Sequence, residues 1–333
     1  MKSLKGIIHK NIKKISKNKN ITITDYDGFV SNYNNILNAI NEINIIDKLS
    51  VYNRIIQRFF NKEFNNQINN KFIKQNGKIE LTIKGETYKI TVKNNKVKAS
   101  SYKVLTKSDS VYIDSPFILD KINEIENVFS FLLDYHNNLY TLSHTDDVKK
   151  KLQLNSDNKG VYGSIITEQK LQEVYDILNN MGIGKLVLKN GSFQYEAYNT
   201  KFELTNVSVG IKTYIILNTL LLNGSIKDDG CIILDEPEVH LHPEYQVKFA
   251  EIIVLLQKVF NLHILINTHS PYFLRAVEVY ASKHSIADKC NYYLAQINED
   301  NKTSDIKEVT KDLEQIYKLL AEPFNMLENM INE

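Results

Sequence analysis

The 333-residue sequence has few of the features that mark disulfide-rich, metal-binding or membrane-spanning proteins. Its two cysteines, Cys231 and Cys290, do not form a C-x-x-C pair, so zinc and redox sites are disfavoured. The longest apolar stretch, Tyr214–Leu222, is interrupted by polar residues and is far shorter than the roughly 20 residues that a membrane span requires. The lysine-rich start has no apolar core of the kind found in signal peptides. These absences predict a cytoplasmic protein without a membrane partner.

Charge of one sign is not in large excess either. The net charge of +2 is too small to indicate nucleic-acid binding by itself. Lysines cluster within the first 19 residues, where a solvated surface is favoured over a phosphate-binding patch. Among the few arginines, Arg54 and Arg58 fit a solvated helix face. Two interpretations of Arg275 fit equally well: a clamp for a phosphate or a partner carboxylate, and a surface ion pair.

Two apolar runs, each followed by polar residues, carry the strongest signal in the sequence. Cys231–Leu234 leads into Asp235 and Glu236, and His263–Ile266 leads through two polar residues to His269. Short apolar runs of this kind predict buried parallel strands, and ligands of parallel sheets bind beyond the carboxyl ends of their strands. We therefore expect these side chains to face one cavity.

These residue types suit the hydrolysis of a nucleotide. Asp235 is placed to hold Mg²⁺ through water, and Glu236 is placed to polarise the water that attacks a γ-phosphate. His269 is placed to reach that phosphate and to sense whether it is present. The pattern predicts ATP and Mg²⁺ as cofactors.

Two further histidines, His240 and His242, are spaced as H-x-H and so invite a metal-binding interpretation. They precede Pro243, which predicts the start of a helix extending through Gln257. We therefore expect both histidines to lie in the loop before this helix, and we favour this interpretation over metal binding.

The strings L-D-E-P-E-V-H-L-H-P-E and I-N-T-H-S-P-Y-F-L-R-A resemble the Walker B strand and switch histidine of ABC-type ATPases. They are typical of the SMC-like and overcome-lysogenisation-defect-like branch, which is common in bacterial phage-defence loci. The resemblance covers most of the chain and is strongest from about Phe202 to Tyr280. It implies an α/β fold like an ABC-ATPase head, with a P-loop NTPase sheet, an antiparallel β subdomain and a helical insertion.

Upstream, N-V-S-V-G-I-K-T resembles the signature motif of the same family. Ser208 and Gly210 precede an expected helix, Ile211–Leu222, and a serine with free backbone amides at a helix start can bind an anion. An ordinary helix cap is the alternative, but the position before the Walker B strand favours the signature. In ABC dimers this site faces the γ-phosphate held by the other subunit. We therefore expect Ser208 to lie far from Asp235 within one monomer.

The amino-terminal part departs from the family pattern. Leu4–Ser16 and Ile21–Gly28 resemble the strands that lead to the phosphate loop, and Asn35–Ile40 resembles the helix that follows it. The loop pattern G-x-x-x-x-G-K-[ST] is missing between them. The candidate nucleotide-binding positions here are Asp27, Gly28, Asn32, Tyr33, Asn34 and Asn35.

Each replacement in this loop removes a physical function. Asp27 adds negative charge in place of the first glycine, and Asn32 is bulkier than the second. Tyr33 brings no positive charge to the phosphates, and Asn34 offers an amide where magnesium prefers a hydroxyl. The helix amino terminus would still favour an anion. The resemblance therefore implies a degenerate Walker A loop.

We expect residues 1–333 to form a single composite domain. Its first lobe, residues 1–110, would hold the degenerate loop and a β meander over Ile79–Val97. A helical insertion over residues 111–183 precedes a second lobe, residues 184–333, which holds a hairpin turning at Asn190-Gly191, the signature, Walker B and the switch histidine. The sequence contains no long heptad array, which excludes long coiled-coil arms.

Two functions remain open. One is an ATPase subunit of a cytoplasmic defence or DNA-maintenance complex, whose ATP-dependent dimerisation controls a partner effector such as a nuclease or toxin. The other is a pseudo-ATPase scaffold without turnover. The damaged loop favours the second, and the intact Asp235, Glu236 and His269 favour the first. A composite site would reconcile them, in which this chain lends Ser208 and Gly210 to a partner ATPase whose loop is intact. The candidate partners are a second copy of the chain in a homodimer, another ATPase in a heterodimer, and DNA. We expect an ABC-type ATPase-like protein with impaired hydrolysis.

Overall fold

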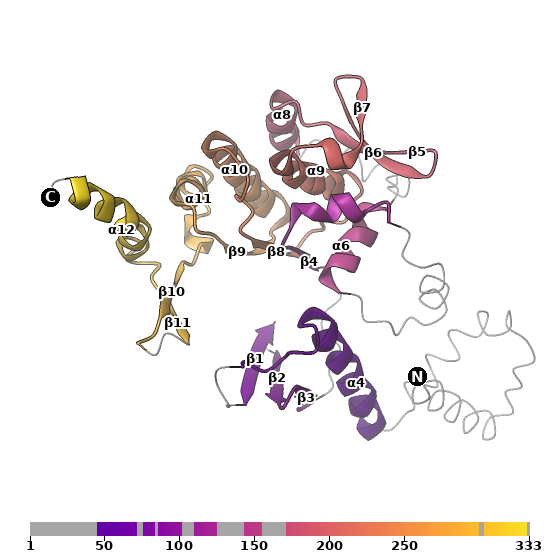
Figure 1. Ribbon diagram of the computed structural model, residues 1–333, viewed down its shortest axis with the longest axis vertical. Helices are drawn as coiled ribbons and strands as arrows, with labels where there is room; N and C mark the ends of the chain where they lie inside the picture. The colour runs from indigo at the N-terminus through magenta and orange to yellow at the C-terminus, as the bar shows by residue number, and fades with distance from the viewer. Residues whose placement is uncertain are drawn as a thin grey trace, which may run out of the picture. The chain divides into compact units, whose positions relative to one another are not determined.

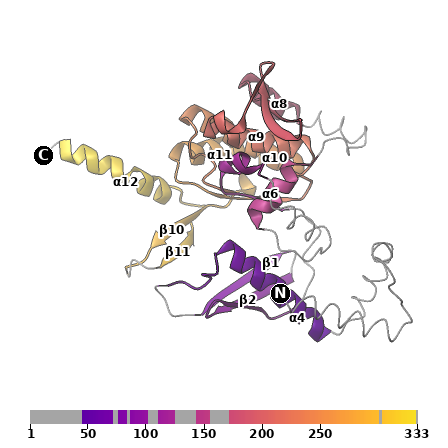
Figure 2. The same cartoon turned by 45° about the vertical axis from the view of Figure 1, so that its right-hand side comes forward.

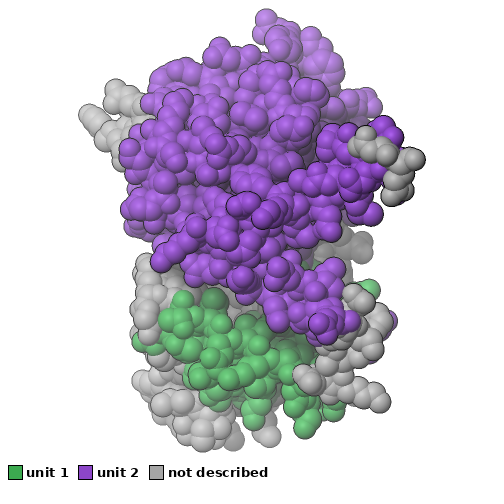
Figure 3. Space-filling view, turned by 90° about the vertical axis from the view of Figure 1, so that its left-hand side faces the viewer, with its two compact units in different colours: residues 1–69, 75–104 green, residues 70–74, 105–333 purple. Residues whose placement is uncertain are grey.

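The computed structural model describes residues 45–71, 76–83, 86–101, 110–124, 143–154, 171–299 and 303–331. The chain divides into two compact units, coloured separately in Figure 3: residues 1–69 with 75–104, and residues 70–74 with 105–333. The segment expected to form a degenerate phosphate loop and the expected helix from Asn35 to Ile40 lie outside the described residues.

The first unit contains a helix and a small antiparallel sheet. Helix α4 (Ile45–Glu63) accompanies strands β1 (Gly77–Ile83), β2 (Glu86–Lys93) and β3 (Lys96–Ala99), which pair in the order β1-β2-β3 (Figure 1). Alternating side chains of β2 and β3 meet Ile56 of α4 in a small apolar core. The meander predicted from the sequence is therefore confirmed.

The second unit is built on three parallel strands. β4 (Ser110–Ile113), β8 (Cys231–Asp235) and β9 (His263–Asn267) pair in the order β4-β8-β9, which places β8 in the centre. The two strands predicted from the apolar runs are confirmed. Together with the surrounding helices they give a mixed α/β fold with a parallel sheet, as expected.

Helices α9 (Val209–Leu222), α10 (Pro243–Phe260) and α11 (Pro271–Lys283) lie on one side of this sheet (Figure 1). Ile232 and Leu234 of β8 are buried in the same core as Phe249 of α10. The helix predicted after the signature segment and the helix start at Pro243 are both confirmed.

The opposite face of the sheet is less covered by the part of the chain that the structure describes. Its side chains come from aligned positions on all three strands: Tyr112, Ile233 and Leu265. The first two are half-buried, and Leu265 is 55% exposed. Apolar side chains on both faces are typical of parallel strands.

The segment 111–183, expected to be a helical insertion, begins inside the central sheet. Val111–Ile113 belong to β4, which pairs with β8. A strand of four residues is too short to show a reliable period, so its membership of the sheet became visible only through this pairing. The described remainder is helical: a 3₁₀ turn η1 (Pro116–Lys121), α6 (His144–Leu152) and α8 (Gln172–Asn180).

The predicted hairpin is also confirmed. β5 (Lys185–Lys189) and β6 (Ser192–Ala197) are joined by Asn190 and Gly191, both with positive φ, and β7 (Thr200–Phe202) adds a third strand. Positive φ at both turn residues is typical of tight hairpins because it matches the twist of the strands. A second 3₁₀ turn, η3 (Leu204–Asn206), leads from β7 to α9.

The chain beyond α11 forms a 3₁₀ turn η4 (Ala287–Lys289), a hairpin of β10 (Tyr293–Ile297) and β11 (Ser304–Glu308), and helix α12 (Glu314–Ile331) (Figure 2). Cys290 lies directly after η4, three residues before β10 starts. Within the described ranges, no helix combines the length and apolar character needed to cross a bilayer.

Candidate functional site

The ends of β8 and β9 bring together three side chains that the sequence analysis selected. Asp235 is the last residue of β8, and its Oδ1 accepts a hydrogen bond of 3.0 Å from Nδ2 of Asn267, the last residue of β9. The backbone N–H of Glu236 donates to the Asn267 carbonyl at 2.9 Å, so the strand pairing continues into the site. The Nε2 atom of His269 lies 3.3 Å from Oε1 of Glu236. The structure therefore places these three residues on neighbouring strand ends, as predicted.

Glu236 adopts an unusual backbone conformation. Its φ is +44°, in the left-handed region that residues with a Cβ rarely occupy. The Val239 N–H donates to the Glu236 carbonyl at 3.0 Å and closes a turn directly after the strand. A non-glycine residue in this region costs on the order of 1–3 kcal/mol, and such residues gather at functional sites. The conformation supports a functional role for Glu236.

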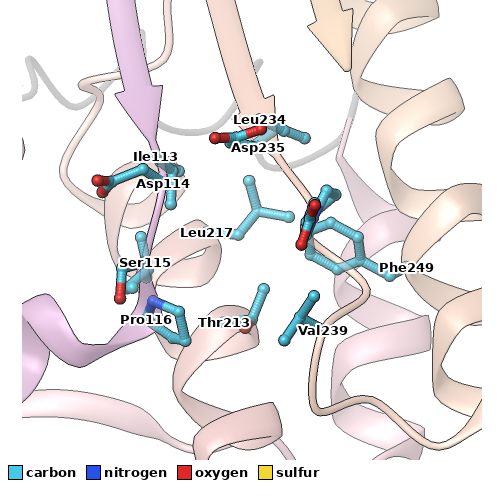
Figure 4. Close-up of a pocket in the computed structure, with 13 residues that line it drawn as sticks. Ile113, Asp114, Ser115, Pro116, Thr213, Leu217, Leu234, Asp235, Val239 and Phe249 are labelled. Carbon is cyan, nitrogen blue, oxygen red and sulfur yellow. The ribbon is translucent and has the colours of Figure 1, made fainter. Parts of the chain in front are cut away.

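A small cavity lies between the carboxyl ends of β4 and β8 and helix α9 (Figure 4). Its volume is about 20 Å³, enough for about one water molecule and far too small for a nucleotide. The residues that line it are Ile113, Asp114, Ser115, Pro116, Thr213, Ile216, Leu217, Leu234, Asp235, Glu236, Pro237, Val239 and Phe249.

That Asp235, Glu236 and His269 face one cavity with the start of the helix at Asn35 stays a prediction, because this helix lies outside the described residues. The first two line the small cavity, whereas the His269 side chain is 84% exposed and does not. β9 ends at Asn267, so the chain has already left the sheet where His269 stands. Among the described residues, the imidazole therefore lies at the surface beyond the strand ends.

The end of β4 contributes Asp114 and Ser115, which the sequence analysis missed. Asp114 Oδ2 lies 3.0 Å from Nε2 of His144 on α6, and the Ser115 side chain caps the η1 turn by accepting from the Phe117 N–H at 3.3 Å. The signal that could have found them is the run V-Y-I followed by D-S-P. It matches, in shorter form, the apolar run that ends at Asp235.

Glu238, in the turn after β8, was also missed. It is 5% exposed, and its Oε1 accepts hydrogen bonds from the Thr268 hydroxyl at 2.5 Å and from the His269 backbone N–H at 3.0 Å. Its signal was the third carboxylate of the string L-D-E-P-E. Burial of a carboxylate between the two strand ends marks it as part of the site.

The signature residues stand at the start of α9. Ser208 occupies the N-cap position, but its exposed side chain makes no capping hydrogen bond within the described part of the chain. Gly210 packs closely: a Cβ there would lie 2.8 Å from the carbonyl oxygen of His240 and 3.1 Å from Cδ2 of Leu241. The glycine is therefore required by contact with the turn after β8.

The basic residue that follows the signature serves a structural contact. Lys212 is 2% exposed, and its Nζ lies 2.5 Å from Oδ1 of Asp120 and 5.9 Å from the ring centre of Phe117. This ion pair ties α9 to η1, which follows β4. Lys212 thus connects the signature helix to the segment that carries Asp114 and Ser115.

The other candidate residues from the sequence analysis make local contacts within the fold. His242 caps α10, its Nδ1 accepting from the Glu244 N–H at 3.3 Å, while His240 packs edge-to-face against Phe117. Arg275 forms an exposed ion pair of 2.7 Å with Glu278, which raises the pKa of its guanidinium. Arg54 donates to the Ser50 hydroxyl at 3.2 Å on its own helix. Of the two interpretations of Arg275, the structure contains the surface ion pair.

The strand-end residues suit magnesium. Mg²⁺ prefers oxygen ligands and is commonly held by one or two carboxylates together with waters and substrate phosphates. Asp235 and Asn267 offer carboxylate and amide oxygens side by side, joined by their own hydrogen bond. The described residues contain no group of three or more His, Cys, Asp or Glu suited to an all-protein metal site, and Mg²⁺ bound together with a nucleotide does not need one.

Comparison with known proteins gives partial similarities. The chain is 32% identical over 102 residues to "Retron Vc95 probable ATPase" from Vibrio cholerae serotype O1 biovar El Tor. This match covers 27% of the chain and only 18% of that relative's length. Among solved structures, the SMC head domain from Thermotoga maritima matches 70% of this chain and 73% of its own, at 13% identity and a TM-score of 0.34.

The family match is much more extensive. A protein-family profile described as "AAA domain, putative AbiEii toxin, Type IV TA system" covers residues 13–275, well over half of the chain. These residues include the segment expected to form the phosphate loop, the segment that resembles the signature, and both strand ends. With Asp235, Glu236 and His269 gathered at the end of a parallel sheet, the chain belongs to this AAA-domain ATPase family.

Proposed function

We propose that the chain is an ABC-type ATPase-like subunit of a bacterial defence or DNA-maintenance complex, in which nucleotide-dependent dimerisation controls a partner effector. The observation that carries the proposal is the meeting of Asp235, Glu236 and His269 at two adjacent strand ends. Membership of an AAA-domain family supports nucleotide use. The similarity to a retron ATPase and the toxin–antitoxin description of the family support a defence role.

The residues at the strand ends have distinct roles in this proposal. Asp235, oriented by Asn267, would hold Mg²⁺, which supplies positive charge to the phosphates. Glu236 would accept a proton from the attacking water, and His269 would contact the γ-phosphate. Since their side chains already lie 3.3 Å apart, small side-chain movements are enough for both to reach the same phosphate group.

Hydrolysis by this chain alone is expected to be impaired. The loop that should hold the phosphates carries Tyr33 where the family has lysine, and Asn32 where it has glycine. Loss of the lysine removes the positive charge that neutralises the β- and γ-phosphates. The partner could be a second copy or a different ATPase whose loop is intact.

The start of α9 supports a composite site between two chains. Ser208 is exposed and its hydroxyl makes no capping bond in the described residues, so it is free to contact a nucleotide held by a second chain. A pseudo-ATPase scaffold is the alternative function, and the altered loop at Asn32 and Tyr33 is the observation that favours it. In that case dimerisation would not depend on nucleotide.

Titration of the purified chain with ATP and Mg²⁺ tests the proposal. The natural chain should bind weakly, and Tyr33→Lys combined with Asn32→Gly and Asn34→Ser should strengthen binding by roughly ten- to a hundredfold, because one charge-assisted contact is worth that much. Tyr33→Lys alone should help less, since Asn32 would still crowd the backbone. Tight binding and fast turnover by the natural chain, lost on Glu236→Gln, would show that the phosphate loop lies at other residues or that another basic group replaces the lysine.

Light scattering with and without ATP tests the dimer. Nucleotide-dependent dimerisation, lost on Ser208→Ala, supports the composite site, whereas a mass that never responds to nucleotide favours the scaffold. Co-expression with the products of neighbouring reading frames tests the partner and effector. Salt-dependent binding of duplex DNA by the purified chain would add DNA to the partners.

A further inference from the structure

Glu238 links the two strand ends of the candidate site. It lies in the turn after β8, two residues beyond Glu236, and both of its hydrogen bonds go to the loop after β9. One comes from the Thr268 hydroxyl and the other from the backbone N–H of His269. The buried carboxylate therefore holds directly the residue whose imidazole faces Glu236.

The contacts of Glu238 continue into a closed hydrogen-bond network. The Thr268 hydroxyl accepts from the Ser270 N–H at 3.1 Å, and the Ser270 hydroxyl donates to Oε1 of Gln246 on α10 at 2.5 Å. Nε2 of Gln246 donates to the Leu241 carbonyl at 3.0 Å, which returns the network to the turn after β8. The backbone of the His269 loop is thus held on both sides, although the imidazole itself is 84% exposed.

The carboxylate of Glu238 is only partly satisfied by hydrogen bonds within the described residues. The second oxygen of Glu238, Oε2, is buried and has no hydrogen-bond partner among the described residues. A buried carboxylate with an unpaired oxygen costs free energy, whereas an apolar residue of similar size would leave the Thr268 hydroxyl and the His269 N–H without their acceptor. The acid therefore serves to hold the His269 loop.

We propose that Glu238 is a positioning residue, which fixes the His269 loop to the Glu236 turn so that the imidazole and the catalytic carboxylate move together. Its effect on the response to nucleotide rests on the proposed ATPase function, whereas the fixing of the loop does not. Glu238 acts through His269 and needs no contact with the substrate.

Hydrogen–deuterium exchange at the His269 amide, in the full chain without nucleotide, tests the fixing of the loop. Glu238→Met should accelerate this exchange by about tenfold or more, because the amide loses a charge-assisted hydrogen bond. Glu238→Gln keeps an acceptor oxygen and should give an intermediate rate. Glu244→Gln, at an exposed acid paired with Lys248 on α10, is the matched control and should leave the rate unchanged.

Unchanged exchange at His269 in a folded Glu238→Met variant would overturn the inference. If that variant does not fold, Glu238→Gln and Thr268→Val provide the same comparison, and wild-type exchange rates in both would overturn it. A second measurement with ATP and Mg²⁺ separates the two proposals. If ATP and Mg²⁺ change the exchange rates of the Glu236 and His269 amides together in the wild type, but independently in Glu238→Met, both proposals are supported. Loss of amide protection without any nucleotide effect would support the role of Glu238 and count against the ATPase.

Discussion

The strand ends and the start of α9 carry the two halves of the candidate site, and they are held in different ways. At the strand ends, side-chain hydrogen bonds join Asp235 to Asn267 and Glu238 to the His269 loop. At the helix start, close packing brings Gly210 onto the His240 carbonyl, and a buried ion pair fixes Lys212. Hydrogen bonds within the protein can be exchanged for hydrogen bonds to a ligand, whereas closely packed atoms resist small displacements. We therefore expect nucleotide to rearrange the strand ends and the helix start to dock as a rigid surface.

The largest effect on stability is expected from Lys212→Met. Removing one partner of a buried ion pair typically costs about 3–5 kcal/mol, and the lower end applies here because Asp120 remains partly exposed to water. The free energy of unfolding, measured by denaturant titration, should fall accordingly.

A second variant separates the ion pair from simple loss of the lysine. The double variant Lys212→Met with Asp120→Leu should recover much of the loss, because no unpaired charge then remains in the core. If Lys212→Met is as stable as the wild type, the helix start is not held by this pair.

Gly210→Ala tests the close packing. The added methyl would approach the His240 carbonyl oxygen to 2.8 Å, so the helix or the turn must shift. Overpacking of this kind typically costs about 1–3 kcal/mol, which denaturant titration should detect. A stability equal to that of the wild type would mean that the turn after β8 can move away, and the contrast between the two halves would lose its basis.

Glu236→Gly should increase the stability of the protein and decrease any ATPase activity. Relief of the positive φ at Glu236 should raise the free energy of unfolding by about 0.5–1 kcal/mol, while any hydrolysis is lost with the carboxylate. Thermal unfolding and phosphate release measure the two effects. The same substitution at Glu244, in the first turn of α10, should only destabilise. Destabilisation at both positions would argue against stored strain at Glu236.

The smallest effect on stability is expected from Ser208→Ala. Replacing a capping serine usually costs about 1 kcal/mol, but this hydroxyl makes no capping bond in the described chain, so a change below about 0.5 kcal/mol is expected. Any nucleotide-dependent dimerisation should nevertheless weaken. A loss of stability without a change in dimerisation would identify Ser208 as an ordinary cap.

Much of the second unit followed from local sequence patterns. The apolar runs that end at Asp235 and before Asn267 predicted two parallel strands, Pro243 predicted a helix start, and Asn190-Gly191 predicted a tight hairpin. Each of these signals depends on a few consecutive residues, because backbone preferences and side-chain alternation act over one or two turns of chain. Their meeting at one edge of a sheet followed from the rule that parallel strands share their carboxyl ends.

Only the tertiary structure decided which residues from distant segments meet at that edge. The pairing of β4 with β8 brought Asp114 beside Asp235, and the fold placed Glu238 between the turn after β8 and His269. Lys212 meets a partner 92 residues away in the chain. Such contacts depend on how whole elements pack and leave no local period in the sequence. The sequence by itself therefore determined the candidate chemistry of the strand ends, and long-range packing decided which side chains hold it in place.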